Sequence, residues 1–329
     1  MAAKNPRKTL VGFHASHELF SPRELIAHVR RAESAGFEAA MCSDHFHPWT
    51  PEQGESGYSF AWLGAAMQAT SLSLGTICCP FVRYYPPIVA QAAATLAQMF
   101  PERFWLAVGT GQALNEHITG RDWPPKPERQ ALLRESADIL RALWAGETVT
   151  HRGKITVLDA KLYSRPDQPP LLFGAAITPE TARWVGSWAD GLLTVNTGAD
   201  QLRKVVDAFR EGGGEGKPMF LQTMVGYDPD ERTAWERAWK NWPIAVLDQS
   251  AAQNLPTPER MAAATAGASV DDIKGKLRVS ADLQQHVEWL QADIDLGFDR
   301  IFLYTISGNP ERFIDAFGEQ VLPRLNRPA

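Results

Sequence analysis

The sequence of 329 residues predicts an α/β fold, a (β/α)8 or TIM barrel with an inserted segment after the seventh strand, at about residues 228–275. Two observations predict it. Eight short apolar runs alternate with segments of helical periodicity, and no linker-like stretch interrupts them, so residues 1–329 are expected to be a single domain. A doubly wound sheet is the alternative, but no G-x-G-x-x-G motif follows the first apolar run, which counts against a Rossmann domain.

The expected strands are short apolar runs bounded by glycine, proline or polar residues. The first covers residues 9–15, and the second leads from Phe37 to Asp44. The other strands are expected at 72–79, 104–108, 171–176, 190–195, 219–227 and 300–305. A small hairpin is expected at 148–162, between the fourth and fifth strands.

The expected helices begin at residues that are typical helix caps. Ser21 and Glu24 form a capping box that opens the first helix, and Gly36 ends it in the left-handed conformation. Thr178 caps a later helix that begins at Pro179. The remaining helices are expected at 60–70, 88–99, 127–144, 201–210, 282–296 and 310–325, with shorter pieces at 232–242 and 258–266.

Composition limits the partners that the chain can have. It is 44% hydrophobic and 22% charged, and its net charge of -5 gives no basic field for nucleic acid. No apolar run reaches the ~20 residues of a membrane span, and residues 1–13 contain no apolar leader segment. Cys42, Cys78 and Cys79 lie in apolar runs and are expected to be buried, reduced thiols. We therefore expect a cytoplasmic protein that acts on a small molecule.

The stretch from Met41 to Trp49 contains the strongest candidate site. Its apolar run is followed by Asp44 and His45, just beyond the carboxyl end of a buried strand, where ligands bind in parallel sheets. His45 suits proton transfer near neutral pH, and a hydrogen-bonded loop histidine is the alternative interpretation. No metal is expected, because His45 and His47 would need a third ligand and no H-E-x-x-H motif or cysteine pair is present.

Polar residues after other strands are expected at the same site. They are His14 after the first strand, residues 76–79 after the third, Thr110, Gln112 and Asn115 after the fourth, 175–178 after the fifth, and Asn196 and Thr197 after the sixth. The free N–H groups of the helix that starts after Thr178 suit a phosphate, and an ordinary helix cap is the alternative.

Three motifs resemble the luciferase-like flavin oxidoreductase superfamily. They are S-D-H-F-x-P-W after the second strand, A-Q-A-A-A-T-L after the third and G-T-G-x-A-L-N-E after the fourth. The resemblance runs from Val11 to Leu325, weakens over 228–275, and is to the branch of coenzyme F420-dependent glucose-6-phosphate dehydrogenases. S-D-H-F-H-P-W and the later I-D-A-F-G also resemble a subgroup predicted to use an ordinary flavin. The resemblance implies the barrel fold, a homodimer, and either FMN or coenzyme F420 as cofactor.

The resemblance also implies roles for single residues. His45 would stabilise or relay the proton as a hydride moves, and Trp49 would pack beside the substrate. Residues 76–78 would form a bulge behind the cofactor ring, where a non-proline cis peptide is usual. The residues expected to bind the cofactor are Asp44, Thr76, Ile77, Cys78, Thr110, Gln112, Asn115, Ala175, Ala176, Ile177 and Thr178. Those expected on the substrate side are His14, Trp49, Asn196, Thr197 and Lys276, and the catalytic group would be His45, Trp49 and Gln112.

Three departures from the sugar-phosphate dehydrogenases change the expected substrate. The catalytic glutamate of their fourth loop is Gln112 here, and an amide cannot usefully exchange a proton. Thr197 replaces one phosphate-binding lysine, and a second has no counterpart because no lysine occurs between Lys240 and Lys274. Lys276 keeps the position of the third positive charge. Charge-assisted contacts dominate phosphate binding, so glucose 6-phosphate is not the expected substrate.

The sequence thus predicts an oxidoreductase that transfers a hydride between a flavin or deazaflavin and a small neutral or hydroxylated substrate. Two alternatives stay open. The first is an FMN-dependent monooxygenase that uses reduced flavin and oxygen, which Gln112 favours because the dehydrogenase acid is missing. The second is a barrel that binds a cofactor without turning over a substrate.

Overall fold

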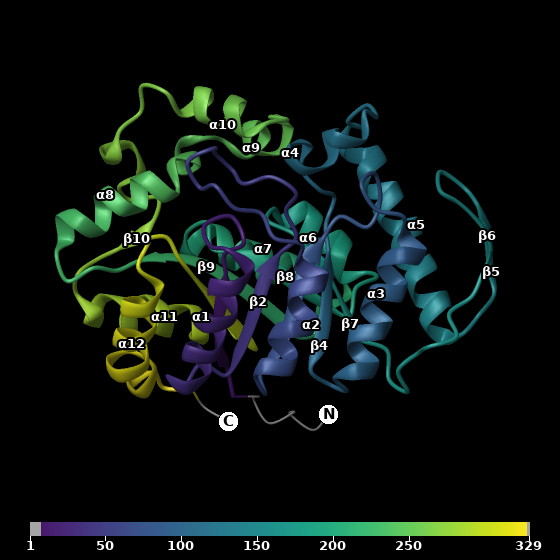
Figure 1. The fold of residues 1–329 in the computed structure, drawn as a ribbon, viewed down its shortest axis with the longest axis horizontal. Coiled ribbons are helices and arrows are strands. Elements are labelled where there is room, and N and C mark those ends of the chain that lie inside the picture. The colour runs from purple at the N-terminus through teal and green to yellow at the C-terminus, as the bar shows by residue number, and fades with distance from the viewer. Residues whose placement is uncertain (1–7, 328–329) are drawn as a thin grey trace.

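The computed structural model describes residues 8–327, which form a closed barrel (Figure 1). Its strands are β1 (Leu10–Ala15), β2 (Ala39–Ser43), β3 (Ser73–Cys78), β4 (Phe104–Val108), β7 (Leu171–Ala175), β8 (Gly191–Val195), β9 (Met219–Gly226) and β11 (Arg300–Thr305). Neighbouring strands are parallel, and β9 pairs with both β8 and β11, which closes the ring. The (β/α)8 prediction is confirmed, and these strands fall within the expected ranges.

Helices cover the outside of the barrel (Figure 1). They are α1 (Pro22–Ser34), α2 (Ser59–Ala69), α3 (Pro86–Met99), α5 (Lys126–Ala145), α6 (Pro179–Gly186), α7 (Ala199–Phe209), α11 (Leu283–Asp295) and α12 (Pro310–Gln320). The predicted capping box is present, because the Glu24 carboxylate accepts the Ser21 N–H at 2.9 Å and the Ser21 hydroxyl accepts the Glu24 N–H. Gly36 has a φ of 93° and ends α1 as expected. The predicted hairpin consists of β5 (Val149–Arg152) and β6 (Thr156–Ala160).

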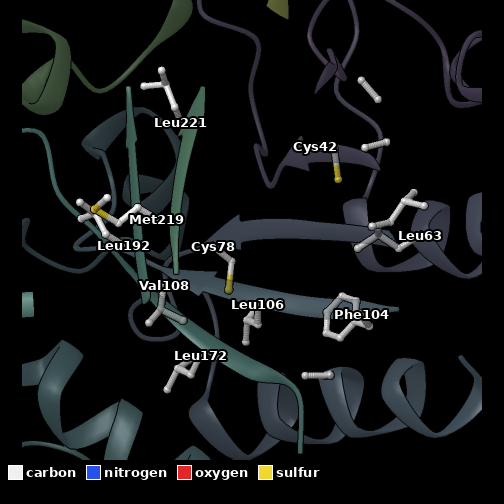
Figure 2. Packing of buried hydrophobic residues seen from close by; sticks show 14 of the residues in the cluster. Cys42, Leu63, Cys78, Phe104, Leu106, Val108, Leu172, Leu192, Met219 and Leu221 are labelled. Carbon is white, nitrogen blue, oxygen red and sulfur yellow. The ribbon is translucent and has the colours of Figure 1, made fainter. Parts of the chain in front are cut away.

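Alternating side chains along the strands form two cores. On β4, Phe104, Leu106 and Val108 point toward the surrounding helices, as Figure 2 shows, whereas Trp105 points into the barrel. A Cβ on Gly75 of the neighbouring β3 would lie 2.2 Å from the Trp105 ring. Because this ring fills the barrel at the level of Gly75, only glycine fits there.

The segment after β9 caps one end of the barrel. It contains α8 (Glu231–Asn241), α9 (Gln249–Asn254), α10 (Pro258–Thr265) and the short strand β10 (Arg278–Val279), which pairs with the end of β9. In Figure 1 these three helices lie together at the upper end of the barrel. The structure contains α8 and α10 at the expected helical pieces. The helix α9 was not predicted because none of its residues is buried, so it has no apolar period.

Strand β3 corrects one expectation. The described peptide bonds include no cis bond, so the cis peptide expected at residues 76–78 is wrong. Ile77 and Cys78 instead continue a regular parallel ladder with Ala107 and Val108 of β4.

Two further expectations concern the termini and the cysteines. Residues 1–7, which belong to the segment where no leader was expected, lie outside the described residues. Cys42, Cys78 and Cys79 are buried and free, as predicted. Over residues 8–327, no helix has both the length and the apolar character needed to cross a bilayer.

Candidate active site

A cavity of about 490 Å³ lies at the carboxyl ends of the strands. Its wall combines strand ends, the loops after β2 and β4, and the capping segment after β9. The expected site residues that line it are Asp44, His45, Trp49, Ile77, Cys78, Thr110, Gln112, Asn115, Ala175, Ala176, Ile177 and Thr197. The structure therefore gathers residues from five different strand ends in one place, as the barrel fold predicts.

The other expected site residues do not line the cavity; they are His14, Thr76, Thr178, Asn196 and Lys276. His14 is buried and stacks on Tyr304, with ring centroids 4.5 Å apart. The amide of Asn196 points away and donates to Asp293 at 3.1 Å. Lys276 is exposed on the capping segment. Direct ligand contact by these residues therefore has no support from the structure.

His45 lies beside a buried acid, Glu18, that was not expected from the sequence. Nε2 of His45 is 3.6 Å from Oε1 of Glu18, and the other carboxylate oxygen is 3.0 Å from Oγ of Ser16 and 3.5 Å from the hydroxyl of Tyr304. Burial alone would raise the pKa of Glu18, but His45 and His14 lower it below its usual value. The carboxylate is thus an anion placed to stabilise positive charge on the His45 ring. Glu18 lies in the loop just after β1, so a wider search of strand-end loops could have found it.

Two tryptophans form the wall beside His45. The Trp49 ring lies 5.1 Å from the His45 ring and 5.7 Å from the ring of Trp242, which belongs to the capping segment. The backbone N–H of Trp49 donates to Gln53 at 2.7 Å, and the Gln53 amide donates to the carbonyl of Asn241 at 2.8 Å. Gln53 therefore joins the loop after β2 to the end of α8.

Asp44 is buried among side-chain donors. One of its oxygens accepts from Ser59 at 2.7 Å and from the Tyr84 hydroxyl at 3.1 Å, and the other accepts from Nη2 of Arg83 at 2.7 Å. Burial alone would lower the pKa of Arg83, but the Asp44 carboxylate, Tyr84 and Glu116 raise it above its usual value. Glu116 also accepts the backbone N–H of Arg83 at 2.8 Å. Asp44 and Glu116 thus share one guanidinium.

The loop after β4 leads into a short helix, α4 (Ala113–Glu116), that was not expected. Gln112 stands at its N-cap, and Asn115 holds the loop after β2 by accepting two backbone N–H groups, at 2.9 and 3.2 Å. The amide nitrogen of Asn115 lies 3.4 Å from Oε1 of Gln112. Asn115 therefore fixes the position of the loop that carries His45.

The sequence did not indicate several cavity residues of the strands, nor those of the capping segment. From the strands these include Gln222, Met224 and Tyr304. From the capping segment they are Trp242, Ile244, Ala245, Leu247, Gln249, Ala252 and Gln253. Within residues 8–327, Lys126 is the one lysine or arginine in the wall, and no group of three histidine, cysteine or acidic residues is arranged to hold a metal ion.

Two buried polar atoms belong to residues of the cavity wall and lack a hydrogen-bond partner among the described residues. They are Nδ1 of His45 and Oγ1 of Thr194. A largely apolar cavity with a few polar atoms suits a flat ring with polar edges.

The family model described as luciferase-like monooxygenase matches residues 7–317. An F420-dependent glucose-6-phosphate dehydrogenase of Beutenbergia cavernae is 34% identical over 326 residues, covering 96% of this chain and 97% of that protein. The solved structure of an F420-dependent secondary alcohol dehydrogenase with an F420-acetone adduct is 31% identical, with a TM-score of 0.89 over 97% of this chain and 99% of that one. An F420-dependent tetrahydromethanopterin reductase of Methanopyrus kandleri, 20% identical with a TM-score of 0.77, covers 97% of this chain and 100% of its own, and shares the fold.

These similarities extend over nearly the whole chain, so they include the barrel, the capping segment and the cavity wall. The prediction of an oxidoreductase enzyme is confirmed. The alternative of a barrel that binds a cofactor without turning over a substrate has no support. The chain belongs to the luciferase-like monooxygenase family.

Proposed function

We propose that the protein transfers a hydride between FMN or coenzyme F420 and a small uncharged alcohol or carbonyl compound. The observation that carries the proposal is the pair of His45 and Glu18 beside the cavity. Oxidation of an alcohol sends the carbon-bound hydrogen away with both electrons, and the hydroxyl proton must go to a base. Nε2 of His45 faces Glu18, which leaves Nδ1 to take that proton, and Glu18 stabilises the charge that results.

The residues at the carboxyl ends of β3, β4 and β7 would hold the cofactor. Ile77, Cys78 and Thr110 line this part of the cavity, and Ala175 to Ile177 lead to the start of α6. The positive end of a helix dipole suits the cofactor phosphate, although the Thr181 N–H already donates to the Thr178 hydroxyl at 3.3 Å. When bound, the cofactor supplies the ring that accepts or donates the hydride.

The wall formed by the capping segment supports an uncharged substrate. Trp242, Ile244 and Leu247 give it an apolar surface opposite the strand ends. Lys126 at the start of α5 is the one cationic side chain in the described wall. The relative whose structure contains an F420-acetone adduct acts on secondary alcohols by its printed name, and we propose the same class of substrate here.

Anaerobic reduction assays test this proposal. Protein supplied with F420 or with FMN is mixed under nitrogen with a panel of small secondary alcohols, and bleaching of the ring absorbance is followed. We expect at least one alcohol to reduce one of the two cofactors. If no alcohol in the panel does so, the hydride-transfer proposal fails.

A flavin monooxygenase is the second candidate, which Gln112 favours because an amide replaces the proton-donating acid of the dehydrogenases. Oxygen consumption by reduced FMN that depends on an added carbonyl compound supports it. A reaction that runs equally well without oxygen excludes it.

Gln112→Glu alone is expected not to create glucose-6-phosphate dehydrogenase activity. The acid returns, but Thr197 still stands in place of one phosphate-binding lysine, and the second lysine still has no counterpart between Lys240 and Lys274. Each charge-assisted hydrogen bond contributes about 1.5–3 kcal/mol, so two missing contacts lower phosphate affinity roughly 10²–10⁴-fold. Combining Gln112→Glu with Thr197→Lys should help more than either change. F420 reduction by glucose 6-phosphate measures this, and high activity in Gln112→Glu alone would mean that the phosphate site lies elsewhere.

We also propose a homodimer that pairs the outer faces of α2 and α3. Neither helix contains a charged residue. Ala61 and Ala65 are exposed on α2, and Ile88 on α3 is 54% exposed. A symmetric interface places a surface against its own copy, so an uncharged face of small residues suits it.

Sedimentation velocity tests the dimer. We expect a dimer for the natural protein and a monomer for Ala65→Arg, because the substitution brings like charges together at the symmetric contact. The matched control is Ala263→Arg at an exposed position of α10, which should stay dimeric. A natural protein that is monomeric at all concentrations would contradict the proposal.

The domain organisation and the location of the protein are also proposals. Residues 1–329 are taken as one barrel domain with an insertion at about 228–275. Free buried thiols at Cys42, Cys78 and Cys79 suit a reducing compartment, so we propose a cytoplasmic location.

A further inference from the structure

Two carboxyl groups in the cavity wall share a single guanidinium. Asp44 and Glu116 both line the cavity. Nη2 of Arg83 is 2.7 Å from the Asp44 carboxylate, and Nε of Arg83 is 3.6 Å from Oε1 of Glu116. The side chains of Arg83, Asp44 and Glu116 are 9%, 0% and 1% exposed. Two potential anions therefore face one cation where water screens them poorly.

The two carboxyl groups differ in their donors. Asp44 accepts hydrogen bonds from the side chains of Arg83, Ser59 and Tyr84. Glu116 accepts the backbone N–H of Arg83, and among the described residues its other oxygen has only the longer contact with Nε. Hydrogen bonds to the charged form favour ionisation, so Asp44 is the better-stabilised anion and Glu116 is the group that takes up a proton.

We propose that Glu116 is a proton-binding residue of the cofactor site, protonated when the cavity holds an anionic ring and ionised when the cavity is empty at alkaline pH. The inference rests on the proposed function. With Glu116 ionised, the cluster of Asp44, Arg83 and Glu116 carries a net charge of about -1, and with Glu116 protonated it is neutral. Reduced flavins and deazaflavins ionise near neutral pH, so the protonated form should bind their anions more tightly.

The environment of Glu116 agrees with this role. Burial raises the pKa of Glu116 to about 7, although Arg83 opposes the rise. Burial raises the pKa of the thiols of Cys78 and Cys79 well above the usual value, so both stay neutral. The titratable or charged groups near Glu116 are Arg83, Asp44, Cys78, Cys79 and Arg129. Elsewhere in the cavity wall they are Glu18, His45, Lys126 and Tyr304. Arg129 lies beyond Gly111, whose carbonyl it contacts at 3.4 Å.

Binding of the reduced cofactor tests the inference directly. Reduced FMN and reduced F420 are titrated under nitrogen into the natural protein and into Glu116→Gln, at pH 6 and pH 8. The amide can still accept the Arg83 N–H but cannot ionise. Affinities of the two proteins should agree at pH 6, and at pH 8 the variant should bind about tenfold more tightly, because only about a tenth of Glu116 is then protonated in the natural protein. Ionisation of the ring itself affects both proteins equally, so it does not change the ratio of their affinities at a given pH.

Thermal unfolding without cofactor gives an independent measurement. The pKa of Glu116 is about 7 in the fold against an ordinary value of 4.5, so the folded protein holds this proton more tightly than the unfolded chain. As pH rises from about 4.5 to about 7, the free energy of unfolding of the natural protein should therefore fall relative to that of Glu116→Gln. Above that range the difference between the two proteins should stay constant. Glu128→Gln, at a side chain 46% exposed on α5, is the matched control and should follow the natural protein.

The outcomes separate the role of Glu116 from the proposed function. An affinity ratio that is the same at pH 6 and pH 8, or an unfolding difference that does not change with pH, overturns the inference about Glu116 and leaves the proposed function intact. Failure of the natural protein to bind either ring overturns the proposed function, and the inference with it.

Discussion

Replacement of His45 by alanine is expected to lower turnover about 10²–10⁴-fold, the usual contribution of a general acid or base. Cofactor affinity should stay within about tenfold, a change of ~1.4 kcal/mol, because the ring would be held mainly by other strand ends. Single-turnover reduction with the best alcohol measures the first effect, and ring fluorescence measures the second. The physical reason is the loss of an imidazole that, alone among residues 8–327, combines a buried carboxylate at 3.6 Å with a place in the cavity wall.

His47→Ala is the matched control for that experiment. Its ring lies two residues away and bonds the carbonyl of Leu114 at 2.9 Å, but it does not line the cavity. Turnover by this variant should remain close to that of the natural protein. A His45→Ala variant that keeps turnover within about tenfold would remove His45 from the mechanism.

Asp44→Ala should cause the largest loss of stability, about 3–5 kcal/mol in the free energy of unfolding. The substitution leaves Arg83 buried without its nearest carboxylate, which lies at 2.7 Å in the natural protein. Urea denaturation measures the effect. Asp44→Leu combined with Arg83→Met should recover part of the loss, because the guanidinium that Asp44→Ala leaves without its nearest carboxylate is then absent.

Asp138→Ala provides the comparison with an exposed ion pair. Asp138 and Arg134 pair at 3.1 Å on α5, with side chains 55% and 45% exposed. Such pairs contribute about 0–1 kcal/mol. Equal losses for Asp44→Ala and Asp138→Ala would show that the buried cluster does not carry the stability assigned to it.

The fold could be predicted because its signals are local. Alternating apolar runs and helical patterns specify a β/α repeat, and caps such as Ser21 with Glu24 mark the start of helices. Strand β4 even has the predicted bounds, 104–108, because a buried parallel strand is a continuous apolar run. The helix α9 has no buried side chain, so nothing in its sequence pattern distinguishes it from a loop.

The site could be predicted only in part, because its chemistry depends on contacts between distant segments. The loop containing Asp44 and His45 was evident from its residue types, and the structure places both in the cavity wall. Arg83, the partner of Asp44, is 39 residues away in sequence, and no local pattern connects the two. Lys276 was expected from the family resemblance just beyond residues 228–275, where the resemblance weakens, and the structure places it outside the cavity.

The cavity at the carboxyl ends of the strands is expected to bind a flavin or deazaflavin ring. Titration of the natural protein and of Gly109→Leu with FMN and with F420, followed by ring fluorescence, tests it most directly. A Cβ at Gly109 would make ordinary contacts, 3.5 Å from the Cβ of Ala175 and 3.8 Å from Ile77, so the backbone accepts a side chain beside two strand ends that line the cavity. We predict that the natural protein binds at least one cofactor at micromolar concentration and that Gly109→Leu binds neither. Binding of neither cofactor by the natural protein, or equal binding by both proteins, would contradict the claim.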